Sequence, residues 1–325
     1  MGLKENGKQE IGWFPGKYED LPCTFRLKGR SFDLTKDNVW LLPCGKCLGC
    51  TLARSRDWAN RCMLELQYHD VAWFVTLTYD DDHLPVRVVD VESAMPTGEV
   101  VEHQTLWYRD YQLFMKRLRK AFPGDHIRYF MAGEYGPKTF RPHYHAIIYG
   151  LHLDDIAFRT KSPLGDSYYT SPALESIWGN GFVLLGKVTW ETCAYTARYC
   201  MKKADGYGRD FYKKLGIEPE FVHMSTGRGI GYQYFEDHPD LFDYAYINVG
   251  TDDGGRKFYP PKYFMRLLQE KDPERYDTLT AQRKELAFNA LEGKLLQTDL
   301  FLDELLHVEE HAKASQIKSL RRNVL

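Results

Sequence analysis

The middle of the chain carries the clearest pattern of apolar and polar positions. The sequence of residues 72–79 is AWFVTLTY, and this nearly continuous run of β-branched and aromatic residues predicts a strand at the centre of a sheet. Residues 127–134, 141–149 and 182–188 predict three further strands on the same grounds. Residues 86–105 alternate weakly around a Pro-Thr-Gly turn, which indicates a hairpin.

Helical periodicity separates these strands. Residues 51–69 and 111–122 place apolar residues on one stripe and basic residues elsewhere, with Asp110 as the expected N-cap of the second helix. Residues 171–178 predict a short helix that ends at a glycine. Residues 189–203 predict a longer helix capped by its first threonine.

The order of these elements is strand, helix, strand, strand, helix, strand, helix. It predicts an α+β fold, with a central antiparallel sheet in a split β-α-β arrangement and helices on one side. We expect a Cys-rich N-terminal segment with a helix at 1–66 and a core at 67–205. A C-terminal loop and helical region is expected at 206–325, with charged helices at 262–293 and 299–323.

Composition limits the function. The chain has 325 residues and a formal net charge of −2, which disfavours indiscriminate nucleic-acid binding, because phosphate binders tend to be basic; a local basic groove stays compatible with it. The sequence predicts no membrane span, since no run of about 18 apolar residues occurs. The first residues, MGLKENGKQEIGWF, lack an apolar signal segment, so we expect a cytoplasmic protein.

Three of the seven cysteines form a compact motif. Cys44, Cys47 and Cys50 follow one another at intervals of three, and the glycines between them let the backbone wrap around one ion. A tetrahedral structural zinc needs a fourth ligand, for which Cys23 is preferred and Cys62 is the other candidate. An iron–sulfur cluster, or a tight turn with reduced, buried thiols, would explain the same spacing.

Two histidines lead into the strand at 141–149. His143 and His145 are two residues apart, so a strand puts both on one face. Glu134 ends the preceding strand, and neighbouring ends of an antiparallel pair would make it a third ligand. Two imidazoles and one carboxylate leave open positions on a divalent ion, which can polarise a phosphoryl oxygen. A His-x-His pair considered alone is more often part of an ordinary strand.

The helix at 189–203 carries a second candidate group. Tyr195, Tyr199 and Lys202 fall at i, i+4 and i+7 and share one face. Tyrosine is a useful nucleophile towards phosphodiesters, because its phenolate leaves more readily than an alkoxide and the covalent step is reversible. Lys202 would favour the phenolate or contact a phosphate, and two tyrosines allow two successive transfers. The alternative is a packing face of the helix, above all for Tyr195.

The ordered set of motifs resembles one known family. The segments PCGKCLGC, DYQLFMKRLRK, GEYG, RPHYH and AYTARYCMKK are similar to those of replication initiators from microvirus-type (gokushovirus) single-stranded DNA phages, within the HUH-endonuclease superfamily. The resemblance covers about residues 40–265, and FVTLTYDD resembles the first motif of the family.

The resemblance implies a site and a reaction. It implies Mg²⁺ or Mn²⁺ on His143, His145 and Glu134, and attack by Tyr199 and Tyr195 on the scissile phosphate of a viral origin. The 5′ end would be held as phosphotyrosine, a free 3′-hydroxyl would prime replication, and a later transfer would circularise the displaced strand.

Partners and alternatives follow from the same residues. Besides single-stranded origin DNA, a host helicase and polymerase are the expected partners in the bacterial cytoplasm, because the chain shows no helicase motif. Arg141 and Lys138 are candidate phosphate contacts, although loop charges are commonly just solvated. Alternatives are a relaxase or transposase, which the Cys motif disfavours, a noncatalytic zinc-stabilised DNA-binding protein, and a metal hydrolase that uses activated water.

Overall fold

The computed structural model forms two compact units, Arg54–Lys271 and, separately, Met1–Ala53 with Asp272–Leu320. The residues that the structure describes are 11–12, 26–28, 39–40, 48–90, 100–162, 165–205, 209–251 and 254–319.

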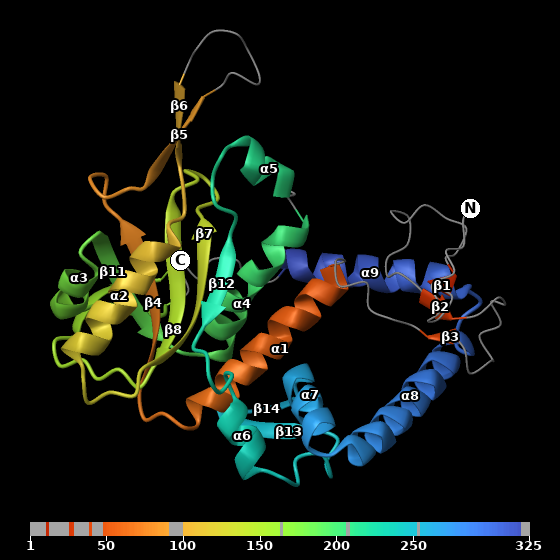
Figure 1. Ribbon diagram of the computed structural model, residues 1–325. Coiled ribbons are helices and arrows are strands. Elements are labelled where there is room, and N and C mark those ends of the chain that lie inside the picture. The colour runs from red at the N-terminus through yellow and green to blue at the C-terminus, as the bar shows by residue number, and fades with distance from the viewer. Residues whose placement is uncertain are drawn as a thin grey trace. The chain divides into compact units, whose positions relative to one another are not determined.

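The larger unit is built on a seven-stranded sheet (Figure 1). Every neighbouring pair in it is antiparallel. In spatial order the strands are β12 (Phe221–Met224), β7 (Arg128–Tyr135), β8 (Pro142–Tyr149), β4 (Ala72–Tyr79), β11 (Gly181–Lys187), β10 (Ser167–Thr170) and β9 (Ala157–Lys161). The α+β class and the central antiparallel sheet are therefore confirmed. Because β4 and β7 both run antiparallel to β8 between them, they point the same way, with α2 in their connection.

Helices cover both faces of this sheet, so the expectation of helices on one side was wrong (Figure 1). Helices α2 (Tyr108–Ala121) and α3 (Pro172–Trp178) pack on one face, whereas α1 (Leu48–Leu66) and α4 (Trp190–Asp205) pack on the other. The physical reason is visible on β4. Its consecutive residues Phe74 and Val75 are both fully buried but belong to different cores, so both faces need an apolar cover.

The ends of the helices were predicted with mixed success. Ser171 caps α3 through its side chain, and Gly179, with φ of 68°, ends it as expected. Thr189 and Thr192 exchange side-chain hydrogen bonds with each other's backbone N–H at the start of α4, which confirms the predicted cap.

Asp110 is not an N-cap. Helix α2 begins at Tyr108, with Trp107 at the capping position and no side-chain cap. The Asp110 carboxylate lies in the first turn and accepts a hydrogen bond of 2.8 Å from the Tyr79 hydroxyl. Asp110 therefore ties α2 to the end of β4, which is a tertiary contact that local sequence does not reveal.

The predicted hairpin at 86–105 is present as β5 (Val86–Asp90) and β6 (Val100–Gln104). Strands β9, β10 and β12 were not predicted from the sequence; β12 and β9 form the two edges of the sheet, and β12 extends it beyond the expected 67–205 core. Between α4 and the end of the larger unit lie α5 (Arg209–Lys214), α6 (Tyr232–Asp237), the hairpin of β13 (Ile247–Thr251) and β14 (Gly254–Phe258), and α7 (Lys262–Lys271).

The long helix predicted at 262–293 is in fact two. Helix α7 ends at Lys271, and α8 (Pro273–Leu295) starts afresh with Asp272 as a side-chain cap and Pro273 in its first turn. The last described helix is α9 (Leu302–Ser319), so the second charged helix is confirmed in its main extent. No described helix is long and apolar enough to cross a membrane.

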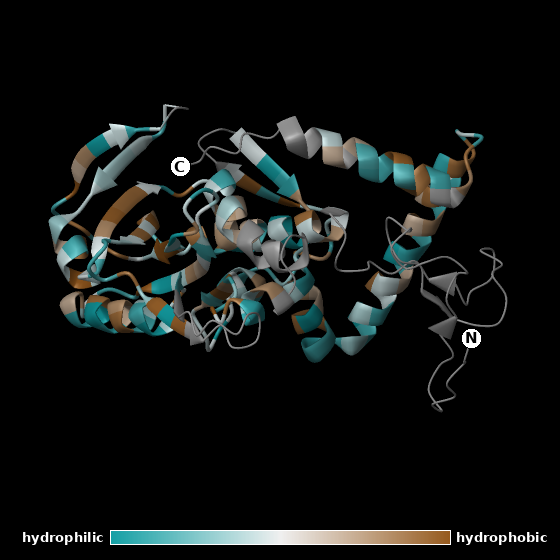
Figure 2. Ribbon diagram, turned by 90° about the horizontal axis from the view of Figure 1, so that it is seen from above, coloured by the Kyte–Doolittle hydropathy of each residue, from teal (hydrophilic) through white to brown (hydrophobic). Residues whose placement is uncertain are grey.

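The smaller unit contains α8, α9 and three short strands, β1 (Ile11–Gly12), β2 (Arg26–Lys28) and β3 (Val39–Trp40). Hydrophilic and hydrophobic residues are interspersed along α8 and α9, and α8 has no buried residue (Figure 2). Lys294 of α8 forms an ion pair with Glu309 of α9. The predicted zinc ligands Cys23, Cys44 and Cys47 lie outside the described residues.

Candidate metal centre

Strand pairing brings the three predicted metal ligands together. Glu134 of β7 is the direct cross-strand partner of His143 of β8, and Ala132 is the partner of His145. Directly paired residues point to the same face of a sheet, and so do residues two apart along a strand. Glu134, His143 and His145 therefore share the face that α4 covers, which is where Ile147 enters its core.

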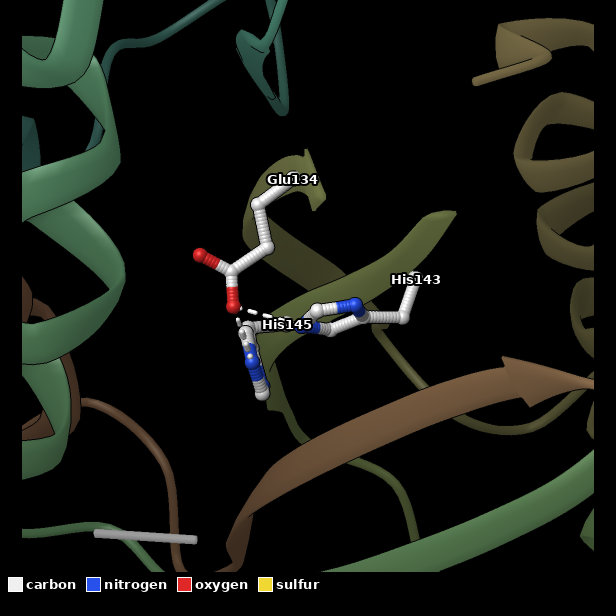
Figure 3. A group of neighbouring side chains, drawn as sticks. All are labelled: Glu134, His143 and His145. Carbon is white, nitrogen blue, oxygen red and sulfur yellow. Dashed lines mark hydrogen bonds and ion pairs between the residues drawn. The ribbon is translucent and has the colours of Figure 1, made fainter. Parts of the chain in front are cut away.

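The side chains converge on a single oxygen (Figure 3). The Nε2 atom of His143 lies 2.5 Å from Oε1 of Glu134, and the Nε2 atom of His145 lies 2.9 Å from the same oxygen. One ligand atom from each residue lies within 4.8 Å of the other two. In the part of the chain that the structure describes, no second group of three such residues is found.

The outer ring nitrogens are held by the strands themselves. Nδ1 of His143 lies 3.1 Å from the backbone carbonyl of Arg141, and Nδ1 of His145 lies 3.0 Å from the Thr76 hydroxyl on β4. A carbonyl oxygen can only accept, so Nδ1 of His143 carries the proton. This leaves the inward Nε2 atoms as the metal-facing atoms, which is the usual arrangement of metal-binding histidines.

Charge at the site favours a cation. Glu134 is buried, and burial raises the pKa of its carboxyl, but the attraction and hydrogen bonds of His145 and His143 outweigh this and lower the pKa to about 2. The carboxylate is therefore ionised at neutral pH. One carboxylate and two imidazoles, each oriented by an outer hydrogen bond, fit a divalent metal ion.

Helix α4 carries Tyr195 to this face of the sheet. Its ring lies edge-on to His145, with 5.1 Å between ring centroids, and 6.3 Å from the ring of Phe74. The half-buried Tyr195 also packs against the core beneath α4. Tyr199 and Lys202 lie on the same helix, but their side chains are outside the described part.

Comparison with known proteins adds the family. The family model for replication-associated protein ORF2/G2P matches residues 72–204, a range that contains the triad and the whole tyrosine motif. Replication-associated protein ORF2 of Spiroplasma virus 4 is 33% identical over 299 residues, which is 90% of this chain and 88% of that protein. This chain belongs to the microvirus-type replication-associated proteins.

Two other members of the family are also similar to it. Replication-associated protein VP4 of Bdellovibrio phage phiMH2K is 31% identical, over 74% of this chain and 72% of that protein. Replication-associated protein ORF4 of Chlamydia phage 1 is 29% identical, over 84% of this chain and 63% of that protein. No solved structure matches the chain.

The other predicted residues of this replication-associated protein lie in different settings. Arg141 donates to Asp81 at 2.7 Å and to the Tyr79 carbonyl at 2.9 Å, so it braces the end of β4. Lys138 is exposed in the loop between β7 and β8. Cys50 is half-buried in α1, whereas Cys62, the alternative fourth zinc ligand, is buried beneath α4.

Sequence reasoning missed the role of Thr76. It is buried in β4, and its cross-strand partner on β8 is His145. A signal was available, because Thr76 and Thr78 are polar residues at alternate positions of an otherwise apolar strand and therefore share one face. The sequence alone did not show that β4 pairs with β8, which places this face beside the histidines.

Proposed function

We propose that this chain is a rolling-circle replication initiator. In this proposal it is a metal-dependent, HUH-type endonuclease that nicks and rejoins single-stranded DNA at a viral origin through a 5′-phosphotyrosine intermediate. Its relatives are replication-associated proteins of phages, which supports the replication role. The order of β4, α2, β7 and β8 is compatible with the split β-α-β plan of that superfamily.

One observation carries the proposal. A ring of a candidate nucleophile, Tyr195, lies against a ligand of the candidate metal centre, His145, with 5.1 Å between their centroids. Tyr199 follows four residues later on α4, about 6 Å farther along the helix axis. A phosphodiester held at the triad would thus meet the helix that carries both phenols.

The proposed reaction keeps the number of phosphoester bonds constant. The phenol oxygen of Tyr199 attacks the scissile phosphorus, the bond from phosphorus to the 3′ oxygen breaks, and that oxygen leaves as a hydroxyl after taking up a proton. The phosphate stays on the tyrosine as a 5′ ester, so no outside energy source is needed to rejoin the strand. Tyr195 would accept the second transfer, and Lys202 would favour the phenolate or hold a phosphate oxygen.

The remaining parts have supporting roles in the proposal. A divalent cation, Mg²⁺ or Mn²⁺, held by Glu134, His143 and His145 would offset the charge that develops on the phosphoryl oxygens. Exposed Lys138 is a candidate contact to the DNA backbone, as is Arg141, whose surface ion pair with Asp81 is of a kind that contributes little stability.

The flanking regions complete the proposal. The N-terminal segment would hold a structural Zn²⁺ on Cys23, Cys44, Cys47 and Cys50. The core at 67–205 would carry the nuclease, and the C-terminal region at 206–325 would serve packing or partner binding. A host helicase and polymerase in the bacterial cytoplasm would supply unwinding and synthesis.

The test is covalent capture of DNA. Single-stranded oligonucleotides tiled across the DNA that encodes the chain are incubated with the full-length protein and Mn²⁺, and adducts are separated on a denaturing gel. We expect one oligonucleotide to give an adduct that Tyr199→Phe reduces sharply and that His143→Ala or a chelator abolishes. Tyr244→Phe, which changes a 63% exposed tyrosine outside α4, is the matched control and should leave the adduct unchanged.

Other outcomes separate the alternatives. An adduct that survives both His143→Ala and chelation would overturn the metal-dependent mechanism. Mass spectrometry that locates the adduct on a tyrosine outside α4 would favour a relaxase or transposase arrangement. DNA binding without any adduct would favour a noncatalytic binding protein, and cleavage without an adduct would favour hydrolysis by activated water.

A further inference from the structure

A row of paired residues crosses the sheet through the candidate metal centre. Glu134 of β7 pairs with His143 of β8, His143 pairs with Thr78 of β4, and Thr78 pairs with Phe182 of β11. Directly paired residues share a face, so all four side chains lie on the face of the triad. Phe182 is two strands from His143, which corresponds to about 10 Å between their Cα atoms.

Exposure rises along this row. The side chain of Glu134 is 3% exposed and that of His143 is 16% exposed. Thr78 is half-buried, and Phe182 is 55% exposed. The side chains of the row are therefore buried at β7 and exposed to solvent at β11. A ligand that reaches His143 along the row passes over Thr78 and Phe182.

The backbone around Phe182 is fixed. Gly181 has φ of 143°, and a Cβ at this position would lie 2.4 Å from the Asp80 nitrogen and 2.5 Å from the Thr78 carbonyl oxygen. The Thr78 hydroxyl donates to the Phe182 carbonyl at 3.3 Å, and the Asp80 N–H donates to the Asn180 carbonyl at 3.0 Å. Phe182 is thus an exposed ring on a constrained part of the sheet. No aromatic ring in the described part of the chain contacts it.

We infer that Phe182 is a stacking platform for a base of single-stranded DNA whose scissile phosphate lies at the triad. The inference rests on the proposed function and adds the residue that holds a neighbouring nucleotide. Single-stranded DNA exposes the faces of its bases, and proteins bind them by stacking on aromatic side chains. A phenylalanine offers only its ring face and edge, so this contact contributes affinity and position with little sequence preference.

The sheet supplies a matched control. Phe158 of β9 is 59% exposed, nearly the same as Phe182. Its partner Tyr169 pairs with Leu185, which belongs to the core under α2 and α3, so Phe158 lies on the opposite face from the triad. An isolated exposed phenylalanine needs no function. The Phe158 ring also lies 6.2 Å from the Tyr169 ring, between centroids, whereas its exposure matches that of Phe182, so the comparison chiefly tests the face that each residue occupies.

The test measures binding without chemistry. The affinity of the full-length protein for a fluorescent single-stranded oligonucleotide that contains the nicking sequence is measured by anisotropy in EDTA at fixed salt. Phe182→Ala should weaken binding by about 5- to 150-fold, as expected for the loss of one stacked base. Phe182→Trp should retain affinity, and Phe158→Ala should stay within twofold of the unsubstituted protein.

The outcomes are separable from those of the proposed function. If the unsubstituted protein binds the oligonucleotide and the Phe182→Ala variant binds it with the same affinity, the inference is overturned while the nuclease proposal stands. Equal losses for Phe182→Ala and Phe158→Ala would also overturn it. If the unsubstituted protein does not bind single-stranded DNA even after Mn²⁺ is added, the proposed function itself fails.

Discussion

The hydroxyl of Thr76 lies 3.0 Å from Nδ1 of His145, on the side of the ring opposite Glu134. If the inward Nε2 is to hold a metal ion, Nδ1 must carry the ring proton and donate it to Thr76. Thr76 therefore acts through His145, as an outer partner that fixes both the tautomer and the orientation of the ligand.

Replacing Thr76 should weaken metal binding although none of the three metal-binding residues is changed. Thr76→Val keeps the shape of the side chain but removes the acceptor, so Mn²⁺ affinity measured by titration calorimetry should fall by about 10- to 100-fold. Thr76→Ser keeps the hydroxyl and should stay close to the unsubstituted protein. Equal affinities for the valine and serine variants would show that the hydrogen bond does not position His145.

Metal affinity should depend on pH through the histidines. Protons compete with the cation for the imidazole nitrogens, so Mn²⁺ affinity should fall as the pH is lowered. Glu134 should add nothing to this dependence above about pH 3, because its pKa is lowered to about 2. Calorimetry from pH 8 to pH 5 measures the slope, and a flat profile would count against imidazole ligands.

Glu134 also has a predictable effect on folding. Its folded pKa of about 2 lies below the ordinary value of 4.5, so its contribution to stability is fully present above pH 4.5 and is lost as pH falls toward 2. Acid unfolding of Glu134→Gln should show a smaller loss of stability over this range than the unsubstituted protein. Parallel curves for the two proteins, followed by circular dichroism without metal, would contradict this.

Gly181 should be intolerant of any side chain. Its φ of 143° and the close approach of Asp80 and Thr78 leave no space for a Cβ, so Gly181→Ala should lower the free energy of unfolding by about 1–3 kcal/mol. Gly250→Ala is the control, because a Cβ there meets nothing within 4 Å. Urea unfolding compares the two, and similar midpoints would show that the sheet adapts at Gly181.

Arg61 should stabilise the larger unit, unlike its neighbour Arg56 on the same helix. The Cζ atom of Arg61 lies 4.0 Å from the centroid of the Trp58 ring and 4.1 Å from the centroid of the Tyr263 ring. The Nε–H of Arg61 donates to the Ile230 carbonyl. Arg61→Met should cost about 2–4 kcal/mol of unfolding free energy.

The matched change is Arg56→Ala. Arg56 is exposed on α1, so its replacement should change the unfolding free energy by less than about 0.5 kcal/mol. Urea unfolding followed by tryptophan fluorescence would measure both variants. A loss at Arg56 as large as at Arg61 would show that the charge of the helix matters more than the buried contacts.

The local sequence pattern was sufficient to predict the central strands and to place both histidines on one face of a strand. Two residues two apart on a strand share a face whatever surrounds them, so His143 and His145 could be paired before any fold was known. Glu134 could be added because a short loop between consecutive strands makes an antiparallel pair, and the structure confirms that Glu134 is the partner of His143.

Long-range pairing decided the rest. The sequence by itself determined which residues could act as ligands and as nucleophiles, because side-chain chemistry and strand or helix periodicity are local properties. Only the tertiary structure decided that Asp110 binds Tyr79 instead of capping its helix, that Thr76 stands behind His145, and that Phe182 shares a row with the triad. These relations depend on which strands become neighbours and on which face each helix covers, and burial of apolar surface on both sides of the sheet selects that arrangement for the chain as a whole.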